Sequence, residues 1–159
     1  MISSSAHAAA AERKVKLQPS SSATAKGELA LWKACVSWGV NPMPCRLVAT
    51  GADGSVIGAS YYNLSQPRAF LSALAVMPAA RGKRLGKLLI ASSVAHMRSA
   101  GCTAVDLHVL GCDASIERHG LYTSCGFRGG DPARGGTYTL AAIPADYEQQ
   151  VMTAPPSSK

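Results

Sequence analysis

Cationic and glycine residues cluster in the stretch from Arg81 to Lys87, which reads Arg-Gly-Lys-Arg-Leu-Gly-Lys. It follows an apolar run that stops at Pro78 and precedes a segment with helical periodicity. The start of a helix presents unpaired backbone N–H groups and the positive end of the peptide dipoles, which together favour a bound phosphate. Gly82 and Gly86 would let a bulky anion approach the backbone closely. We therefore expect a nucleotide or coenzyme pyrophosphate to bind here, while a solvated basic turn would carry the same pattern.

Two strands and a helix must position this stretch. Residues 69 to 77 form a nine-residue apolar run with one Ser, which predicts a central strand covered on both faces. Residues 84 to 100 have a period of 3.6 and predict a helix, and residues 103 to 110 predict a second buried strand. A strand, helix and strand in this order imply a parallel pair with a right-handed crossover. The expected core face of the helix carries Leu89, Ile90, Ser93, Val94 and Met97, and the expected outer face carries Lys87, Ala91 and Arg98.

The remaining elements are shorter. An Asp-Gly turn at Asp53 predicts that two strands form an antiparallel hairpin before the central strand. The expected helices span residues 28–38 and 115–124, the hairpin strands 45–50 and 55–63, the late strands 127–129 and 137–143, and a short edge strand 13–18.

The chain of 159 residues and 16.4 kDa fits one domain, which we expect at residues 27–143. Residues 1–26 are rich in Ser, Ala and Lys/Arg, which is typical of a disordered tail or of an organellar transit segment. Residues 144–159 read as a polar C-terminal tail. The apolar runs fall short of the ~20 residues of a membrane-spanning helix, so we expect no membrane association.

The charge is uneven: 16 Lys plus Arg face 9 Asp plus Glu, which gives a net charge of +7. No carboxylate occurs between Asp53 and Asp106, while six basic residues lie in that interval. This excess predicts an anionic partner. Nucleic acid is disfavoured as that partner, because aromatics make up only 6% of the chain and do not alternate with basic residues.

The five cysteines are widely spaced, with no C-x-x-C pair and no nearby His at zinc-finger spacing, so we expect no metal. An odd number of cysteines favours a reducing compartment. We expect the cytoplasm, or a chloroplast or mitochondrion if residues 1–26 are a transit segment.

Two motifs resemble the GNAT superfamily of acyl-CoA-dependent N-acetyltransferases. The run V-x-P-x-x-R-G-K-R-L-G-x-x-L beginning at Val76 is similar to that family's phosphate loop, Q/R-x-x-G-x-G/A, and L-Y-x-x-x-G-F beginning at Leu121 is similar to its late Tyr followed by Gly-Phe. The resemblance covers residues 45–143. It departs from the family at Arg84, where the first loop glycine is usual, and at Arg118, where a small residue is common.

The resemblance implies an α/β fold: a mixed central sheet with an antiparallel N-terminal hairpin, a parallel strand pair splayed around the coenzyme, and flanking helices. It implies acetyl-CoA as cosubstrate and a primary amine of a small molecule or peptide as the acceptor that attacks the thioester directly, in a monomer or homodimer. The alternative is a non-catalytic acyl-CoA-binding or assembly subunit with the same fold. The coenzyme contacts implied by the family are Leu74, Ala75, Val76, Arg81, Gly82, Lys83, Arg84, Leu85, Gly86, Lys87 and Ser115.

The family resemblance also implies catalytic roles. A backbone N–H near Val76 would stabilise the oxyanion, and Tyr122 would protonate the departing sulfur, although Tyr122 could also serve as an aromatic anchor. Many relatives carry a Glu on the strand before the loop, but here that strand offers only Ser72. His108 is the first candidate base, with an unperturbed pKa near 6.5, and Asp131 is the second; either could instead be structural.

Overall fold

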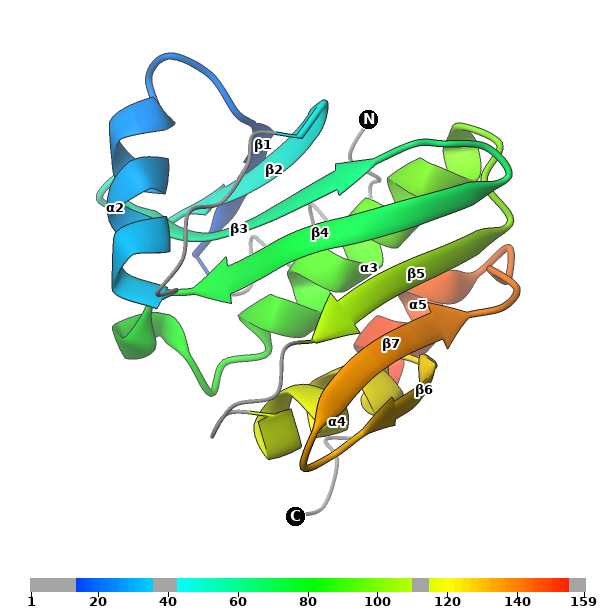
Figure 1. Ribbon diagram of the computed structural model, residues 1–159. Helices are drawn as coiled ribbons and strands as arrows, with labels where there is room; N and C mark the ends of the chain where they lie inside the picture. The colour runs from blue at the N-terminus through cyan, green and yellow to red at the C-terminus, as the bar shows by residue number, and fades with distance from the viewer. Residues whose placement is uncertain (1–13, 36–42, 110–114, 155–159) are drawn as a thin grey trace.

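The structure is a computed structural model that describes residues 14–35, 43–109 and 115–154, with only the backbone described at residues 115 and 116. Seven strands form one sheet in the order β1-β2-β3-β4-β5-β7-β6 (Figure 1). All neighbouring strands are antiparallel except β4 and β5, which are parallel. The strands are β1 Lys16–Pro19, β2 Cys45–Thr50, β3 Val56–Asn63, β4 Arg68–Val76, β5 Ala104–Val109, β6 Arg128–Asp131 and β7 Gly135–Leu140.

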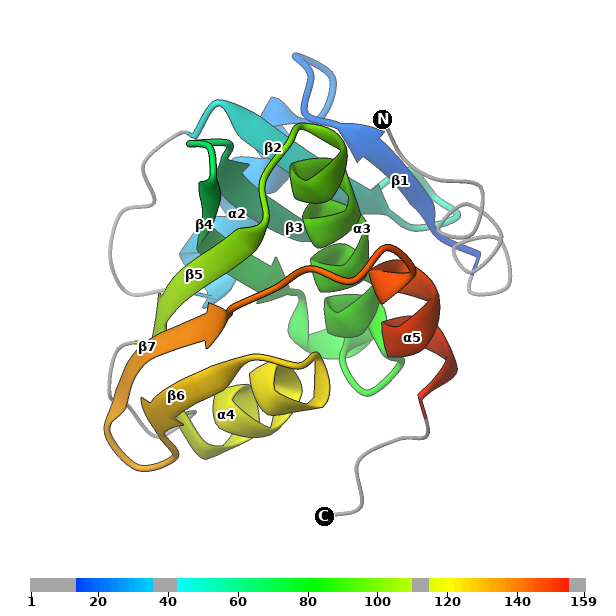
Figure 2. The same cartoon turned by 90° about the vertical axis from the view of Figure 1, so that its right-hand side faces the viewer.

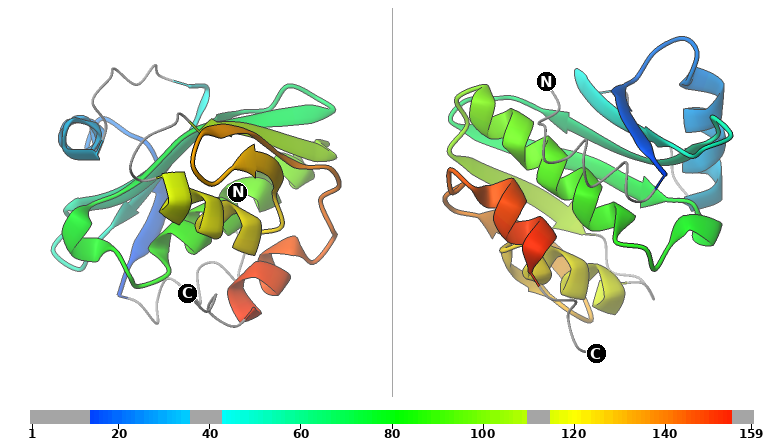
Figure 3. Two further views of the ribbon diagram at one scale, coloured as in Figure 1. Left: turned by 60° about the horizontal axis from the view of Figure 1, so that its bottom comes forward. Right: turned by 180° about the vertical axis from the view of Figure 1, so that it is seen from behind.

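Helices cover the sheet unequally. Three of them, α3 Leu85–Ser99, α4 Ser115–Ser124 and α5 Tyr147–Thr153, lie on one face, and α2 Ala25–Cys35 lies on the other (Figure 3). The main core forms between the sheet and α3, and a smaller cluster forms where Leu31 and Trp32 of α2 pack on β3 and β4. The mixed sheet with its N-terminal hairpin and one parallel pair confirms the expected fold class.

The hairpin and the edge strand follow from local sequence. β2 and β3 pair antiparallel, and in the turn between them the Asp53 carboxylate accepts hydrogen bonds from the backbone and hydroxyl of Ser55 at 3.0 and 2.6 Å. Gly54 has φ +82°, a conformation that glycine adopts without steric cost. β1 pairs with β2 at the edge of the sheet, so the ordered fold already begins within the segment expected as a tail.

β4 is the central strand, as expected, but it is covered on both faces only near its C-terminal end. Its first residues alternate between exposed and buried side chains, and Phe70 is 37% exposed. The reason is the short reach of α2, which packs over Ala75 but leaves the opposite end of β4 open.

The expected polar tail after Pro144 is wrong for residues 147–153, which form α5. This helix lies alongside α3 (Figure 2), and Tyr147 and Val151 are buried there. The hydroxyl of Tyr147 donates a hydrogen bond to the carbonyl oxygen of Cys125 at 2.6 Å. The outer face expected for α3 is wrong for the same reason, because Lys87 and Ala91 are buried in this second layer.

The last two strands are placed differently from the expectation of 127–129 and 137–143. β6 and β7 instead run from Arg128 and from Gly135, while Phe127 before them is fully buried in the core. A Cβ on Gly130 (φ +65°) would lie 2.2 Å from the ring of Tyr138, so a side chain has no room at this position.

Candidate active site

The parallel strands β4 and β5 separate toward their C-terminal ends. Their pairing runs from Arg68 opposite Ala104 to Leu71 opposite Leu107, while β4 continues to Val76. Figure 1 shows the ends of the two strands pointing apart. The second half of β4 therefore has an edge that no strand of the described chain pairs with on the β5 side.

The backbone groups on that edge can be identified from the β3–β4 register. Met77 donates its N–H to Ile57 at 2.8 Å, and Val76 lies opposite Gly58. Hydrogen-bonded and non-hydrogen-bonded pairs alternate along antiparallel strands, so Leu74 and Val76 turn their N–H and C=O groups away from β3. The predicted oxyanion donor near Val76 thus faces the gap between β4 and β5.

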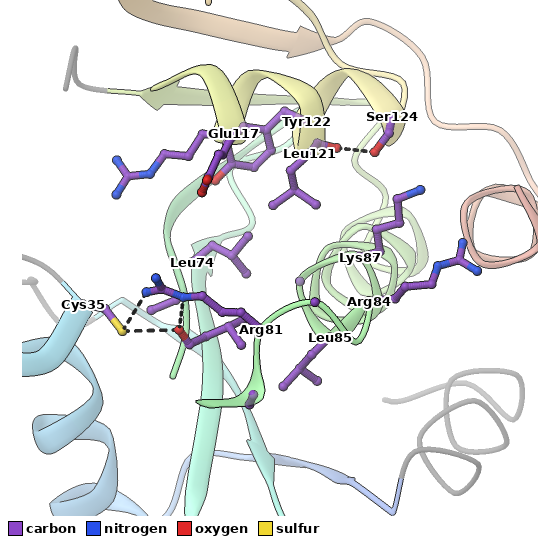
Figure 4. Close-up of a pocket in the computed structure, with 16 residues that line it drawn as sticks. Cys35, Leu74, Arg81, Arg84, Leu85, Lys87, Glu117, Leu121, Tyr122 and Ser124 are labelled. Carbon is purple, nitrogen blue, oxygen red and sulfur yellow. Dashed lines mark hydrogen bonds between the residues drawn. The ribbon is translucent and has the colours of Figure 1, made fainter. Parts of the chain in front are cut away.

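A cavity of about 480 Å³ opens at this gap and extends to the start of α3 (Figure 4). Its size suits a substantial part of a coenzyme. The lining residues that sequence reasoning predicted are Leu74, Ala75, Val76, Arg81, Gly82, Arg84, Leu85, Gly86, Lys87 and Tyr122. Lys83 is exposed on the same loop without lining the cavity, and Ser115 is the first residue of α4, with its side chain outside the described residues.

The start of α3 is built to hold an anion. The first helical hydrogen bond joins the N–H of Leu88 to the carbonyl of Arg84, and no side chain caps the helix. The N–H groups of the three preceding helical residues, Leu85, Gly86 and Lys87, therefore have no acceptor within the helix. Because this end of α3 borders the cavity, those N–H groups and the positive end of the helix dipole can stabilise a bound phosphate.

Arg84 departs from the family motif at a position with an unusual backbone. Its φ of 62° and ψ of 18° are left-handed, which explains why glycine is usual at this place in the family. Its guanidinium donates a hydrogen bond of 2.8 Å to the carbonyl of Ala154, which follows α5. The side chain therefore reaches toward α5, where it neither crowds nor pairs with a phosphate at the loop (Figure 4).

Lys87 carries a buried amine without a partner. The residue is 7% exposed, and its Nζ forms no hydrogen bond within the described part of the chain. A buried ammonium without a counter-charge is costly, and an anion bound at the start of α3, next to Lys87, would offset part of that cost. The residues at this end of the cavity fit a coenzyme pyrophosphate.

Arg81 ties the loop to the end of β4. Its Nε donates to the carbonyl of Val76 at 2.9 Å, and its Nη2 lies 3.8 Å from the sulfur of Cys35. The same carbonyl lies 3.5 Å from the Cys35 sulfur. These contacts hold the phosphate loop next to the free edge of the strand.

Tyr122 projects from α4 into the cavity (Figure 4) and is 8% exposed. Burial raises its pKa to about 12, and the positive charge of Arg118 opposes this only in part. Its ring also packs edge-on against Phe127 at 6.1 Å and against Tyr138 at 5.9 Å, measured between ring centroids. Tyr122 therefore packs in an aromatic cluster and also lines the cavity.

The family model described as acetyltransferase (GNAT) family matches residues 17–127, more than half of the sequence. The chain belongs to the GNAT acetyltransferase family. A mycothiol acetyltransferase of Propionibacterium freudenreichii subsp. shermanii is 31% identical over 99 residues. That match covers 55% of this GNAT chain and 32% of the relative, so the chain spans about a third of its length.

Solved structures share the GNAT fold at low sequence identity. A GNAT family N-acetyltransferase of Escherichia coli in complex with CoA has a TM-score of 0.61 and 20% identity, covering 85% of this chain and 84% of that one. Ard1 of Thermoplasma volcanium has a TM-score of 0.67 and 17% identity, covering 82% of this chain and 99% of that one. The ribosomal-protein-S18-alanine N-acetyltransferase of Escherichia coli has a TM-score of 0.65 and 15% identity, covering 79% of this chain and 90% of that one.

The two candidate bases lie apart from the cavity of this GNAT chain. His108 is exposed on β5, and its Nδ1 lies 3.3 Å from the hydroxyl oxygen of Thr137. Asp131 accepts hydrogen bonds from the N–H groups of Ala133 and Arg134 at 2.8 and 2.9 Å, which lower its pKa and shape the turn after β6. Neither residue lines the cavity, and a catalytic role for either stays a prediction.

Sequence reasoning did not single out several lining residues: Cys35, Ala80, Glu117, Leu121 and Ser124. Cys35 comes from α2, far away in the sequence, and nothing local indicates that α2 ends at the phosphate loop. Glu117 stands five residues before Tyr122 on a predicted helix, and this proximity was the available signal. Among the described residues there is no group of His, Cys, Asp or Glu that could hold a metal ion, and no helix long and apolar enough to cross a membrane.

Proposed function

We propose that the chain is an acetyl-CoA-dependent N-acetyltransferase that transfers an acetyl group to a primary amine of a small molecule or peptide by direct attack. The observation that carries this proposal is the uncapped start of α3, with the buried unpaired Lys87, joined by one cavity to the free edge of β4. Membership of the GNAT family and the CoA complex of the Escherichia coli structure support the same ligand.

Coenzyme binding would satisfy the groups that lack partners. The pyrophosphate lies against the start of α3 and Lys87, and the pantetheine arm runs along the edge of β4 between that strand and α4. The N–H of Val76 then donates to the thioester oxygen as negative charge develops there. A preorganised donor of this kind lowers a barrier by ~3 kcal/mol.

Tyr122 would donate a hydrogen bond to the departing sulfur. A pKa of about 12 keeps its hydroxyl protonated at neutral pH. An ordinary thiol has a pKa near 8.5, so complete proton transfer from this phenol to the thiolate is uphill by roughly 3.5 pKa units, or about 5 kcal/mol. Efficient turnover therefore requires a second group that returns a proton to Tyr122 as the thiolate leaves.

A coenzyme-release assay tests the proposal. The relatives include a mycothiol acetyltransferase and a ribosomal-protein-S18-alanine N-acetyltransferase, so the panel covers small amines, amino acids, aminoglycosides and peptide N-termini. We expect acetyl-CoA consumption that depends on an amine and yields its acetylated product by mass spectrometry. Saturable coenzyme binding without product across the panel would favour the non-catalytic acyl-CoA-binding subunit.

The compartment is proposed from composition, and the assembly from the family resemblance. We place the protein in the cytoplasm, or in a chloroplast or mitochondrion if residues 1–26 are a transit segment, as a monomer or homodimer. A fluorescent fusion with and without these residues tests the compartment, and light scattering of the purified chain tests the assembly.

A further inference from the structure

An amine must lose a proton to become an amide, and β4 supplies no group to take it. A primary amine of lysine type has a pKa near 10.4, so it is mostly in its ammonium form at neutral pH. A proton acceptor beside the thioester therefore accelerates the attack. Ser72 on β4 is exposed and lies outside the cavity lining. The acceptor must therefore come from another wall of the cavity.

We propose that Glu117 of α4 is the general base of this chain. It is the one carboxylate among the described residues that line the cavity. This inference rests on the proposed acetyl transfer and assigns to a named residue the role for which sequence reasoning found no carboxylate at the expected place.

The helix brings Glu117 and Tyr122 to the same wall. The cavity face of α4 includes two adjacent rows with four-residue spacing, Glu117 with Leu121 and Arg118 with Tyr122, and Ser124 at the end of the helix. Positions 117 and 122 lie about 7.5 Å apart along the helix axis and about 140° apart around it, so the two side chains stand at the two edges of this face. Figure 4 shows both side chains projecting from α4 on the side that faces Leu74 of β4.

The carboxylate of Glu117 is exposed and available to take a proton. No hydrogen bond or ion pair to it is found within residues 14–35, 43–109 and 115–154. Four other acids of the described chain are engaged by neighbouring groups: Glu28 by Ser20, Thr24 and Tyr61, Asp53 by Ser55, Asp106 by Arg68 and Thr139, and Asp131 by Ala133 and Arg134. None of these four acids lines the cavity.

The protons balance between the two side chains of α4. The acceptor in its ammonium form first passes one proton to Glu117, which releases it to water. The amine nitrogen then forms a bond to the thioester carbon and passes its second proton to the Glu117 carboxylate, while the carbon–sulfur bond breaks and the sulfur takes the proton of Tyr122. The protonated carboxyl group then returns its proton to the Tyr122 oxygen through water in the cavity. A carboxylic acid is a far stronger acid than a phenol, so this return offsets the uphill donation by Tyr122.

The charged surroundings of Glu117 are mainly cationic. The other titratable or charged groups that line the cavity are Cys35 from α2, Arg81 and Arg84 from the loop, Lys87 from α3, and Arg118 and Tyr122 from α4. The coenzyme phosphates would lie against the loop and the start of α3 and leave Glu117 at the acyl end.

The test compares E117Q, the conservative variant E117D, the rival variant H108N and the control D146N, each as the full chain. D146N makes the matching acid-to-amide change at an exposed residue outside the cavity lining. We measure kcat and KM against pH with an amine from the panel, and CoA affinity by calorimetry. E117Q should lower kcat at pH 7 by about 10²-fold, within the range for a removed general base, with CoA affinity unchanged within about twofold. The deficit should shrink as pH rises and the free amine becomes abundant, and E117D should recover part of kcat. D146N should behave like the wild type, and H108N should keep the pH dependence of the wild type.

Three results would overturn the assignment of Glu117 in an active wild type. These are a kcat of E117Q near the wild-type value across the pH range, a loss of CoA affinity equal to the loss of kcat, or a loss of the pH dependence in H108N instead. A wild type that forms no product with any amine contradicts the proposed function itself, and the role of Glu117 falls with it. The activity of the wild type thus separates the two failures.

Discussion

At the residue scale, the cavity contains side chains whose placement disfavours stability and favours a ligand. Lys87 places an ammonium where no described partner meets it, and Arg84 holds a left-handed backbone that costs an L-residue roughly 1–2 kcal/mol. Strain of this kind tends to gather at functional sites. Single substitutions here should therefore move stability and binding in opposite directions.

Replacing Lys87 with Met tests that opposition. The unpaired charge disappears while the apolar part of the side chain stays, so thermal unfolding of the unliganded chain should occur a few degrees higher. A charge-assisted hydrogen bond is worth about 1.5–3 kcal/mol, so the affinity for CoA should fall by about 10- to 100-fold. A lower Tm together with unchanged affinity would show that Lys87 serves only the fold.

Replacing Tyr122 with Phe keeps the ring that packs on Phe127 and removes the hydroxyl. We expect kcat to fall by about 10²-fold or more, with CoA affinity changed much less, because the hydroxyl acts on the departing sulfur. The raised pKa means that the wild-type hydroxyl loses its proton only near pH 12, so it contributes no alkaline loss of activity below about pH 11. Weakened CoA binding with unchanged turnover would contradict the role given to Tyr122.

At the scale of elements, the C-terminal helix connects the phosphate loop to the helix that carries Tyr122. Arg84 holds the end of α5 through Ala154, and Tyr147 at its start holds Cys125 after α4. A cation near the carbonyl end of a helix is favourable for the helix dipole as well as for the hydrogen bond. α5 is therefore part of the scaffold of the site.

The pair R84A and R84G separates the two effects at this position. Both variants lose the hydrogen bond to Ala154, and only Ala keeps the left-handed strain of a side chain. R84G should be more stable than R84A by about 1 kcal/mol in chemical denaturation. Equal stabilities would mean that the backbone at position 84 is not left-handed in solution.

The docking of α2 should weaken in acid. Burial disfavours the charged form of Glu28, but hydrogen bonds from Ser20, Tyr61 and Thr24 outweigh that effect and lower its pKa below the usual 4.5. The stabilisation is therefore fully present above about pH 4.5 and is lost as pH falls through the lower folded pKa.

We expect the unfolding free energy of the wild type to fall more steeply below pH 4.5 than that of E28Q, whose amide does not titrate in this range. Denaturation curves at several pH values check this. If the unfolding free energies of the wild type and E28Q changed with pH in parallel, Glu28 would not be the cause of the loss of stability in acid.

At the scale of the whole molecule, the sequence predicts what depends on local periodicity and short motifs. The Asp-Gly hairpin, the central position of β4, the helix after the basic loop and most of the cavity lining were expected because each has a signal within about fifteen residues. The α5 helix has three apolar residues, Tyr147, Val151 and Met152, in seven positions after a proline, too few to predict burial. The burial of Lys87 and the hydrogen bond from Arg84 to Ala154 both depend on α5, so neither could be predicted.

The role inferred for Glu117 also required the folded chain. In the sequence it is one exposed acid on a short helix, and only the cavity shows that it faces β4 across the gap. Cys35 reaches the same cavity from the opposite side of the sheet, through a contact that has no local signal.

A titration of the isotopically labelled chain with CoA, followed by amide correlation spectra, tests the central claim most directly. Binding at the start of α3 and along β4 predicts that the largest saturable shifts occur at the N–H groups of Leu74, Val76, Leu85, Gly86 and Lys87, with little change in β1. The absence of saturable shifts at these amides, or larger shifts in β1 and β2, would contradict the claim that this cavity holds the coenzyme.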